Sequence, residues 1–297
     1  MSFVSRFKKP EYYLRPISIF NRIFSNSKGV KQVITPWRVK IEVDAAEIIG
    51  KAIIQMGVYD LAVSELLWRL IKEGDFVLDI GANIGYTVGI CSVRTGQMGN
   101  VWAFEPNPLL KSRISTNIRL LPCQNVTLYP IALSSISGEG SLVLPDDYKQ
   151  NEGVAFIGHE TASNSVKVDL KKLDDILPEG KVVQVMKIDV EGHELSVFQG
   201  GLKAIGNRSI QNIVFEDHHT YPSDVAKLLL KHGYTIFRVE KDWTGVKLCD
   251  PNTRSTAPAW EPANYLATFK SHDFLKNIIG SGYECLKSHR KFKEKNL

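Results

Sequence analysis

The chain has 297 residues, 43% of them hydrophobic and 23% charged, which is ordinary for a soluble globular protein and enough for one large domain with extensions. No apolar run approaches the roughly 18 to 20 residues of a membrane span, and no apolar segment with a small-residue cleavage site opens the chain, so we expect neither a span nor a secretory signal. The net charge is +5, but residues 41–270 hold 22 basic and 28 acidic residues, and this acidic centre argues against a nucleic-acid enzyme.

The positive charge is concentrated at the two ends of the chain. Residues 1–40 hold nine Lys or Arg and one acid, and residues 271–297 hold six Lys or Arg and three acids. We therefore predict a basic N-terminal extension over 1–50, a main domain over 51–270 and a basic C-terminal tail over 271–297. The ends are either simply solvated or in contact with an anionic membrane surface, and the extension could also pack on the main domain.

Helical and strand patterns alternate through the main domain. Apolar residues at helical spacing mark the helices, and short runs rich in Val, Ile and Phe mark the strands. The predicted helices cover 58–73, 84–95, 108–121, 193–205 and 222–233. The predicted strands cover 76–80, 100–106, 126–134, 165–170, 182–190, 212–217 and 234–240, with a last one at 264–269. This alternation predicts βαβ units, a mostly parallel sheet and a doubly wound α/β fold.

Four acidic residues stand at the ends of predicted strands. They are Asp79, Glu105, Asp189 and Glu216. In doubly wound sheets, ligands bind beyond the carboxyl ends of the strands. The sequence therefore predicts an acidic ligand site along this edge of the sheet.

The first strand runs into a glycine turn, FVLDIGANIGYT at 76–87, which differs from a dinucleotide-binding turn. Asn83 stands where the second glycine of G-x-G-x-x-G would allow the backbone to approach a pyrophosphate, and Tyr86 replaces the third glycine. Asp79 would also lie near two phosphate charges, which is unfavourable. The turn therefore argues against a dinucleotide.

S-adenosylmethionine suits the same turn better. It has no phosphate, and its sulfonium and ammonium groups suit an acid such as Asp79 at the strand end. The helix that begins near Gly85 can direct free N–H groups at the methionine carboxylate. Glu105, twenty residues further along, could accept both ribose hydroxyls. We therefore predict S-adenosylmethionine as the cofactor.

The segment MKIDVEGHE at 186–194 resembles the K-x-D-x-E-G-x-E signature of the FkbM-type methyltransferases. Four other segments, in the correct order, are similar to further parts of that family: VLDIGANIGYT, WAFEPNP, VKVDLKKLDDIL and IVFEDH. The resemblance runs from about residue 58 to 240 and leaves both basic ends uncovered.

The resemblance implies a class I methyltransferase fold with a seven-stranded sheet. It implies O-methylation of a hydroxyl on a sugar, polysaccharide or natural product, so the expected partner is a small-molecule or glycan acceptor. The cofactor positions implied by the family motifs are Asp79, Gly81, Asn83, Gly85, Glu105 and Asn107. Asp189 would be the fourth-strand acid close to the transferred methyl group.

A base assists methyl transfer to a hydroxyl, because a sugar hydroxyl is a weak acid. The candidate catalytic residues are Asp189, His193, Glu216 and His218, with His219 beside them. Asp189, Glu216 and His218 could also converge on a divalent metal, although no spacing requires one.

Neighbouring residues have structural alternatives. Lys187 either functions in the site or pairs with an acid, and Glu191 and Gly192 are expected to shape the turn into the next helix. Tyr221, Trp243 and Trp260 either stack on a sugar face or pack in the protein.

Other functions of the same fold stay open at this point. One is a non-catalytic module that binds S-adenosylmethionine or a nucleotide, and another is an N-methyltransferase. Nucleic-acid amino-methyltransferases often carry an Asn/Asp-Pro-Pro-aromatic motif after the fourth strand, which is absent at Asp189, so no nucleic-acid partner is expected. The four cysteines form no CxxC pair, which favours reduced thiols and a cytoplasmic protein.

Overall fold

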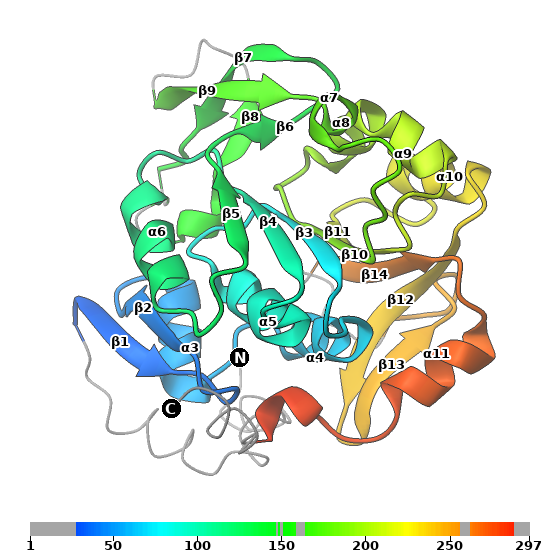
Figure 1. The fold of residues 1–297 in the computed structure, drawn as a ribbon, viewed down its shortest axis with the longest axis horizontal. Helices are drawn as coiled ribbons and strands as arrows, with labels where there is room; N and C mark the ends of the chain where they lie inside the picture. Colours follow the sequence, from blue (N-terminus) through cyan, green and yellow to red (C-terminus); the bar gives the residue numbers. More distant parts are fainter. Residues whose placement is uncertain (1–27, 147, 149–150, 159–163, 256–261, 288–297) are drawn as a thin grey trace.

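The computed structural model describes residues 28–146, 148, 151–158, 164–255 and 262–287 (Figure 1). Most of the predicted extension (1–27) and the end of the basic tail (288–297) lie outside the described residues, so the predicted membrane-surface contact is not tested there.

A central sheet of eight strands organises the fold, in the order β13-β12-β14-β11-β10-β3-β4-β5. Its strands are β3 (Phe76–Ile80), β4 (Asn100–Phe104), β5 (Val126–Tyr129), β10 (Val185–Ile188), β11 (Asn212–Asp217), β12 (Thr235–Asp242), β13 (Gly245–Cys249) and β14 (Ala263–Thr268). From β5 to β11 the neighbours run parallel, whereas β14 lies antiparallel between β11 and β12. The predicted doubly wound fold is confirmed, and β13 adds an eighth strand at the edge.

Helices cover both faces of this sheet (Figure 1). They are α3 (Ile48–Met56), α4 (Leu61–Leu70), α5 (Tyr86–Thr95), α6 (Lys111–Arg119), α7 (Leu173–Ile176), α8 (Glu194–Gly200), α9 (Leu202–Gly206), α10 (Asp224–Lys231) and α11 (His272–Ile279), with 3₁₀ turns η2 (Glu152–Val154) and η3 (Glu284–Leu286). The expected helix 193–205 is divided at Gly201 into α8 and α9.

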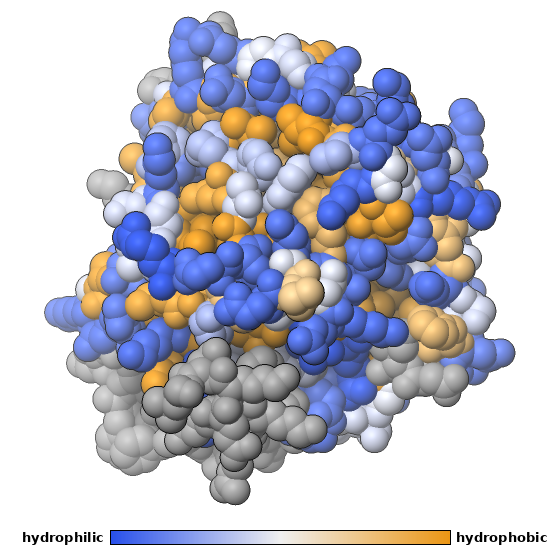
Figure 2. All heavy atoms as spheres, in the orientation of Figure 1, coloured by the Kyte–Doolittle hydropathy of each residue, from blue (hydrophilic) through white to orange (hydrophobic). Residues whose placement is uncertain are grey.

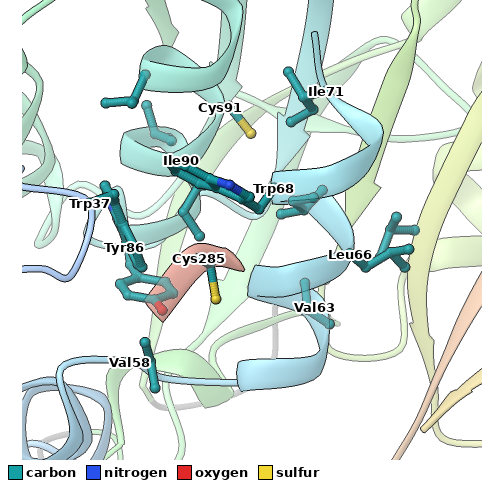
Figure 3. Packing of buried hydrophobic residues seen from close by; sticks show 14 of the residues in the cluster. Trp37, Val58, Val63, Leu66, Trp68, Ile71, Tyr86, Ile90, Cys91 and Cys285 are labelled. Carbon is teal, nitrogen blue, oxygen red and sulfur yellow. The ribbon is translucent and has the colours of Figure 1, made fainter. Parts of the chain in front are cut away.

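Alternate residues of each central strand enter opposite hydrophobic cores. Val77 of β3 packs in the core with α4 and α5, whereas Leu78 packs in the core with α8, α9 and α10. Figure 3 shows the first core, where Trp68 of α4 and Ile90 of α5 approach Cys285 of η3. Strands that bury both faces read as continuous apolar runs, which explains why β3 was recognisable in the sequence.

Two small sheets flank the central one. The hairpin of β1 (Val30–Ile34) and β2 (Lys40–Asp44) lies within the predicted N-terminal extension. The second sheet has the order β6-β9-β7-β8, with β6 (Ala132–Leu133), β7 (Gly138–Val143), β8 (Phe156–Gly158) and β9 (Ser165–Lys171). The single strand expected over 126–134 is therefore wrong: the chain passes at Pro130, which cannot donate a ladder hydrogen bond, from β5 into the other sheet.

The hairpin packs on the main domain rather than standing apart from it. Val43 is fully buried, and Asn117 of α6 accepts the N–H of Glu42 at 2.7 Å and donates to its carbonyl at 3.0 Å. Asn117 also donates to the carbonyl of Ile84, in the turn after β3, at 2.7 Å. α3 spans residues 50 and 51, on either side of the predicted boundary.

The C-terminal turn η3 docks on α4 through a buried carboxylate. The side chain of Glu65 is fully buried and accepts the N–H groups of Glu284 and Cys285 at 2.8 Å each. It also pairs with Arg69, whose guanidinium donates to the carbonyl of Ser281 at 3.1 Å. This anchor joins the start of the main domain to the predicted tail.

Candidate active site

A cavity of about 590 Å³ opens at the carboxyl ends of β3, β4, β10 and β11. Its size is typical of small-molecule sites, which range over about 300 to 1,000 Å³. On the face in Figure 2, hydrophilic residues dominate and apolar residues appear in groups between them. Of the ten site residues predicted from the sequence, eight line the cavity: Gly81, Asn83, Glu105, Asn107, Asp189, His193, Glu216 and His218. The other two, Asp79 and Gly85, do not line the cavity.

Gly81 is required by a close approach between two strand ends. A Cβ at this position would lie 1.8 Å from the carbonyl oxygen of Asp189, and the φ of +76° also favours glycine. The N–H groups of Gly81 and Ala82 both donate to the carbonyl of Phe104 at 3.0 Å. The turn therefore connects the ends of β3, β4 and β10.

Glu105 is held rigidly at the end of β4. Its two carboxylate oxygens accept the N–H groups of Asn83 at 2.7 Å and Asn107 at 2.9 Å. Burial raises the pKa of Glu105 to about 7, although these two hydrogen bonds oppose the shift. Each oxygen keeps a further lone pair, so the carboxylate can accept two neighbouring hydroxyls of a ligand.

Asn107 orders the loop that follows Glu105. Its side chain is buried, accepts the N–H of Leu109 at 3.0 Å and donates to the hydroxyl of Tyr148 at 2.7 Å. The Asn107 side chain is therefore already bonded to protein groups. The backbone N–H of Asn107 helps to orient Glu105.

The N-terminus of α5 meets the cavity without a side-chain cap. Gly85 is its N-cap residue, in the left-handed conformation at φ 85°, and makes no side-chain capping bond. Tyr86 and Thr87 of the first turn line the cavity. The first-turn N–H groups of a helix have no partners within the helix, so this end suits a carboxylate.

Asp79 faces a lysine rather than the cavity. β3 and β10 pair in parallel with Asp79 opposite Lys187, and this register places both side chains on the same face of the sheet. Asp79 is fully buried, accepts the hydroxyl of Thr87 at 2.6 Å and has its other oxygen 3.6 Å from the Lys187 ammonium. The expected direct contact between Asp79 and the cofactor's cationic groups therefore has no support in this geometry.

Lys187 joins three parts of the site. Its ammonium donates to the carbonyl of Gly81 at 2.9 Å and lies 3.4 Å from the carboxylate of Asp189. Burial alone would lower the pKa of Lys187, but Asp189 and Asp79 together raise it above its usual value. The ammonium therefore stays charged and offsets the two carboxylates. Lys187 therefore pairs with acids, and its functional role stays a prediction.

The turn after β10 has an unusual backbone. Glu191 and Gly192 both have positive φ, at 52° and 90°. Glu194 is buried and accepts the N–H groups of Val190 and Gly192 at 3.2 Å each. In the motif EGHE, the second acid therefore holds the turn that presents Glu191 to the cavity.

Glu216, Glu191 and His218 meet at the acidic end of the cavity. The His218 Nε2 atom lies 3.8 Å from Glu191 and 3.9 Å from Glu216. Burial, with repulsion from Asp189 and then Glu191, raises the pKa of Glu216 to about 9. Burial and the Asp189 charge raise the pKa of Glu191 to about 7.

The raised pKa of Glu216 predicts that the protein loses stability as the pH rises. The folded protein keeps this proton up to about pH 9, whereas the unfolded chain releases it near the ordinary value of 4.5. Ionisation is therefore less favourable in the folded state, and the free energy of unfolding should fall between these pH values.

Glu216→Gln removes this titration and should flatten the decline. Urea unfolding of both proteins at about pH 5.5, 7 and 8.5 measures it. Glu139→Gln, on an exposed side chain of β7, is the control. Equal slopes for wild type and Glu216→Gln would contradict the assignment.

The other histidine candidates differ in position. His193 lines the cavity, its Nε2 atom lies 3.0 Å from the hydroxyl of Ser134, and burial lowers its pKa. His219 is 73% exposed, contacts Asp217 at 3.2 Å and does not line the cavity.

The two predicted aromatic residues that the structure describes, Tyr221 and Trp243, do not line the cavity. Tyr221 stacks on Tyr265, with ring centroids 5.8 Å apart, which favours its packing interpretation. Trp243 is exposed and does not line the cavity, and Trp260 lies outside the described residues.

Sequence reasoning missed several cavity residues, among them three that lie close to one another. Tyr59 and Asp60 precede α4, and Asn264 lies on β14. Asp60 caps α4 by accepting the N–H groups of Ala62 at 3.0 Å and Val63 at 3.1 Å, and its other oxygen accepts the Asn264 amide at 3.1 Å. An aspartate before an apolar helix is an N-cap signal, but nothing in the local sequence indicates that this cap also faces a cavity.

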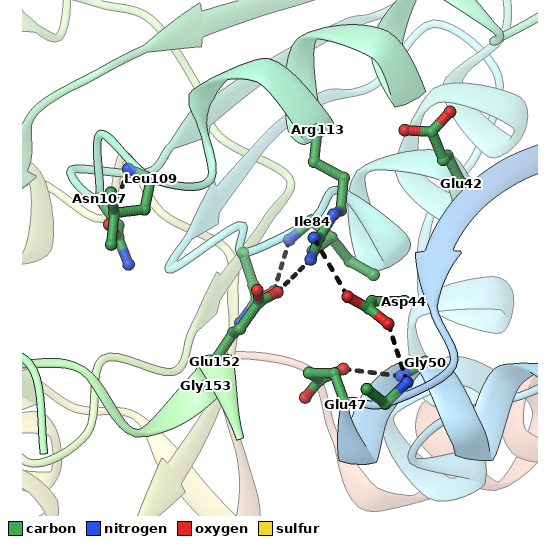
Figure 4. Close-up of polar contacts among 12 residues, drawn as sticks. Glu42, Asp44, Glu47, Gly50, Ile84, Asn107, Leu109, Arg113, Glu152 and Gly153 are labelled. Atoms are coloured by element: carbon green, nitrogen blue, oxygen red, sulfur yellow. Dashed lines mark hydrogen bonds and ion pairs between the residues drawn. The ribbon is translucent and has the colours of Figure 1, made fainter. Parts of the chain in front are cut away.

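The η2 turn forms another missed wall. Figure 4 shows Arg113 of α6 directed at Glu152 of η2 and at Asp44 of β2. The Arg113 and Asp44 charges lie 3.9 Å apart. Residues 151–155, which line the cavity, are thus tied to the elements that carry the glycine turn.

No group of three His, Cys, Asp or Glu side chains that could hold a metal ion occurs within residues 28–287 as far as the structure describes them. The expected convergence of Asp189, Glu216 and His218 on a metal therefore lacks the necessary geometry. In the same part of the chain, no helix is long and apolar enough to cross a membrane.

The chain is similar in sequence to known methyltransferases. The family model described as the methyltransferase FkbM domain matches residues 79–236. The hexuronic acid methyltransferase AglP of Haloferax volcanii is 34% identical over 174 residues, covering 56% of this chain and 66%, just under two thirds, of that protein. The methyltransferase sdnD of Sordaria araneosa is 29% identical over 232 residues, covering 67% of this chain and 85% of that protein.

Among solved structures, TYW2 of M. jannaschii in complex with AdoMet covers 82% of this chain and 86% of its own, at 13% identity and a TM-score of 0.42. That likeness is too distant to define the fold, which rests on the strand order above. The family match covers more than half of the chain and includes the glycine turn, Glu105 and the MKIDVEGHE segment. The chain belongs to the FkbM methyltransferase family.

Proposed function

We propose that this protein is an S-adenosylmethionine-dependent O-methyltransferase that acts on a hydroxyl of a sugar, polysaccharide or other natural product. The observation that carries the proposal is the anchored carboxylate of Glu105, which lines the same cavity as Asp189 and Glu216. The Haloferax volcanii relative is named for a sugar acid, which supports an acceptor of the sugar type.

The residues present fit the cofactor. Glu105 would accept the ribose hydroxyls, because both its oxygens face fixed N–H groups and retain lone pairs. The open first turn of α5 would bind the methionine carboxylate. Gly81 and Asn83 would shape the turn between these two points, and Asp79 would act through Lys187 rather than by contact. When bound, S-adenosylmethionine supplies an electrophilic methyl group.

The acidic end of the cavity would orient the acceptor and remove its proton. We propose that His218 accepts the hydroxyl proton at Nε2, because the Glu191 carboxylate lies 3.8 Å from this atom and would stabilise the resulting cation. Asp189 pairs with Lys187 and would position the acceptor hydroxyl. Glu216 holds a proton at neutral pH, so it would donate rather than accept a hydrogen bond.

Two substitutions separate cofactor binding from chemistry. Glu105→Ala should weaken the binding of S-adenosylmethionine at least about tenfold, because it removes two charge-assisted hydrogen bonds. His218→Asn should leave that affinity unchanged and lower kcat by about 10² to 10⁴-fold. Calorimetric titration and initial rates of methyl transfer measure the two effects.

His219→Asn is the matched control for His218, since His219 lies one residue away and faces Asp217 outside the cavity. Equal losses of kcat in the two histidine variants would remove His218 as the base. Binding without turnover on any acceptor would favour a non-catalytic module, and preferred transfer to amines over hydroxyls would favour an N-methyltransferase.

A further inference from the structure

The acceptor end of the cavity has a surplus of negative charge. Four carboxyl groups line it, those of Asp60, Asp189, Glu191 and Glu216. Glu216 holds a proton at neutral pH, so the negative charge comes from the other three. The ammonium of Lys187 is already held between Asp79, Asp189 and the carbonyl of Gly81. The other lysine in the lining is Lys241.

Repulsion from neighbouring acids raises the pKa of Glu191 and of Glu216. Apart from burial, the Asp189 charge is the largest influence that raises the pKa of both Glu191 and Glu216. A further anion placed among them would meet the same repulsion. A bound carboxylate is therefore disfavoured at this end of the cavity.

An apolar wall adjoins the acidic end. Ile48, Ala52 and Met56 of α3 line the cavity, and Ile48 keeps 51% of its surface exposed. α3 ends at Met56, and Tyr59, three residues further along, lines the cavity next to Asp60. Tyr59 is close enough to Asp189, Asp60 and Glu216 for their charges to raise its pKa, so it connects the apolar wall to the acids. An apolar side chain left open beside a cavity is suited to bury an apolar part of a ligand.

We infer that the acceptor is an uncharged, hydroxyl-bearing molecule with an apolar portion that packs on α3, and that a carboxylate-bearing sugar is a poor acceptor. This inference rests on the proposed function, whose acceptor class it narrows. The hydroxyl would lie among the acids, where the ionised carboxylates accept its hydrogen bond and Glu216 donates one to its oxygen. The apolar portion would lie against Ile48 and Met56.

The test compares n-octyl β-glucoside, n-octyl β-glucuronide and glucose, each below its micelle-forming concentration. Calorimetry with the full chain, saturated with S-adenosylhomocysteine, gives the three dissociation constants. The octyl glucoside should bind at least about tenfold more tightly than the glucuronide, because of charge, and than glucose, because of apolar burial.

Substitutions at Glu191 and Ile48 test whether the acids cause the charge preference and α3 causes the apolar preference. Glu191→Gln should reduce the discrimination between glucoside and glucuronide about tenfold, since one charge is removed at nearly constant shape. Ile48→Asp should reduce the advantage of octyl glucoside over glucose. Asp224→Asn, on an exposed side chain of α10 outside the cavity, controls for the change in total charge.

Equal or tighter binding of the glucuronide, or binding of none of the three sugars, would overturn the inference. A separate titration of the ligand-free protein with S-adenosylmethionine distinguishes failure of the inference from failure of the proposed function. If the cofactor binds and the glucuronide is preferred, the inference fails and the proposed function stands. If the cofactor does not bind, the proposed function fails first.

Discussion

Replacing Gly81 with alanine is expected to lower the affinity for S-adenosylmethionine by at least about 100-fold. The added Cβ would lie 1.8 Å from the carbonyl oxygen and 2.9 Å from the carbonyl carbon of Asp189, so the glycine turn and the end of β10 must move apart. Displacements of about 1 Å in a site can cost two orders of magnitude. The same movement would separate the Gly81 carbonyl from Lys187.

Calorimetric titration with S-adenosylmethionine measures this loss, and Gly180→Ala provides a matched control. Gly180 has φ +72°, close to the +76° of Gly81, but no heavy atom lies within 4 Å of its added Cβ. Both variants therefore carry similar backbone strain, and only Gly81→Ala introduces a clash. Unchanged affinity in Gly81→Ala would show that the two strand ends can separate without harm to the site.

Replacing Glu65 with alanine is expected to lower the free energy of unfolding by about 3 to 5 kcal/mol. The substitution leaves the N–H groups of Glu284 and Cys285 and the guanidinium of Arg69 without the carboxylate that they share. Removing a buried charged partner lowers the free energy of unfolding far more than breaking an exposed ion pair does. Urea unfolding followed by circular dichroism measures the change.

Two further variants define the origin of that loss. Glu65→Gln keeps one acceptor oxygen and should lose only part of the stability. Glu139→Ala breaks an exposed pair with Lys167 and should change little. A small effect of Glu65→Ala would show that η3 contributes little to the folded state, and partial proteolysis after residue 270 would then be tolerated.

The central strands were recognisable from the sequence because they are buried on both faces. β3, β10 and β11 are short apolar runs, and even β14, far from the rest, was expected at nearly its observed position. The hairpin of β12 and β13 was not expected, because its turn, DWTG at 242–245, lacks the Asn-Gly or Asp-Gly pair that marks a short hairpin.

The sequence predicted those site residues that directly follow or end a strand of the parallel sheet. Glu105, Asp189 and Glu216 all reach the cavity, as a parallel sheet requires. The pairing of Asp79 with Lys187 depends on the register between β3 and β10. These strands are more than a hundred residues apart, and the local sequence of either strand does not indicate that register.

Residues outside the family match also contribute to the cavity and the core, and the local sequence did not indicate this. Asp60 reads as an ordinary helix cap, and only its bond to Asn264 on a distant strand places it beside the cavity. We propose that the folded unit begins before residue 51 and continues past residue 270, because the β1–β2 hairpin and η3 both pack on the same core.

The position of β14 also constrains the order in which the chain can fold. β11 and β12 follow one another in sequence, yet each pairs with β14 and not with the other, and Val214 lies opposite Leu266. During synthesis, both strands therefore present unpaired edges until residues 263–268 have emerged. Such edges readily pair with other chains. A ribosome pausing between β12 and β14 would prolong this vulnerable stage, so the rate of translation over that interval should influence the yield of folded protein.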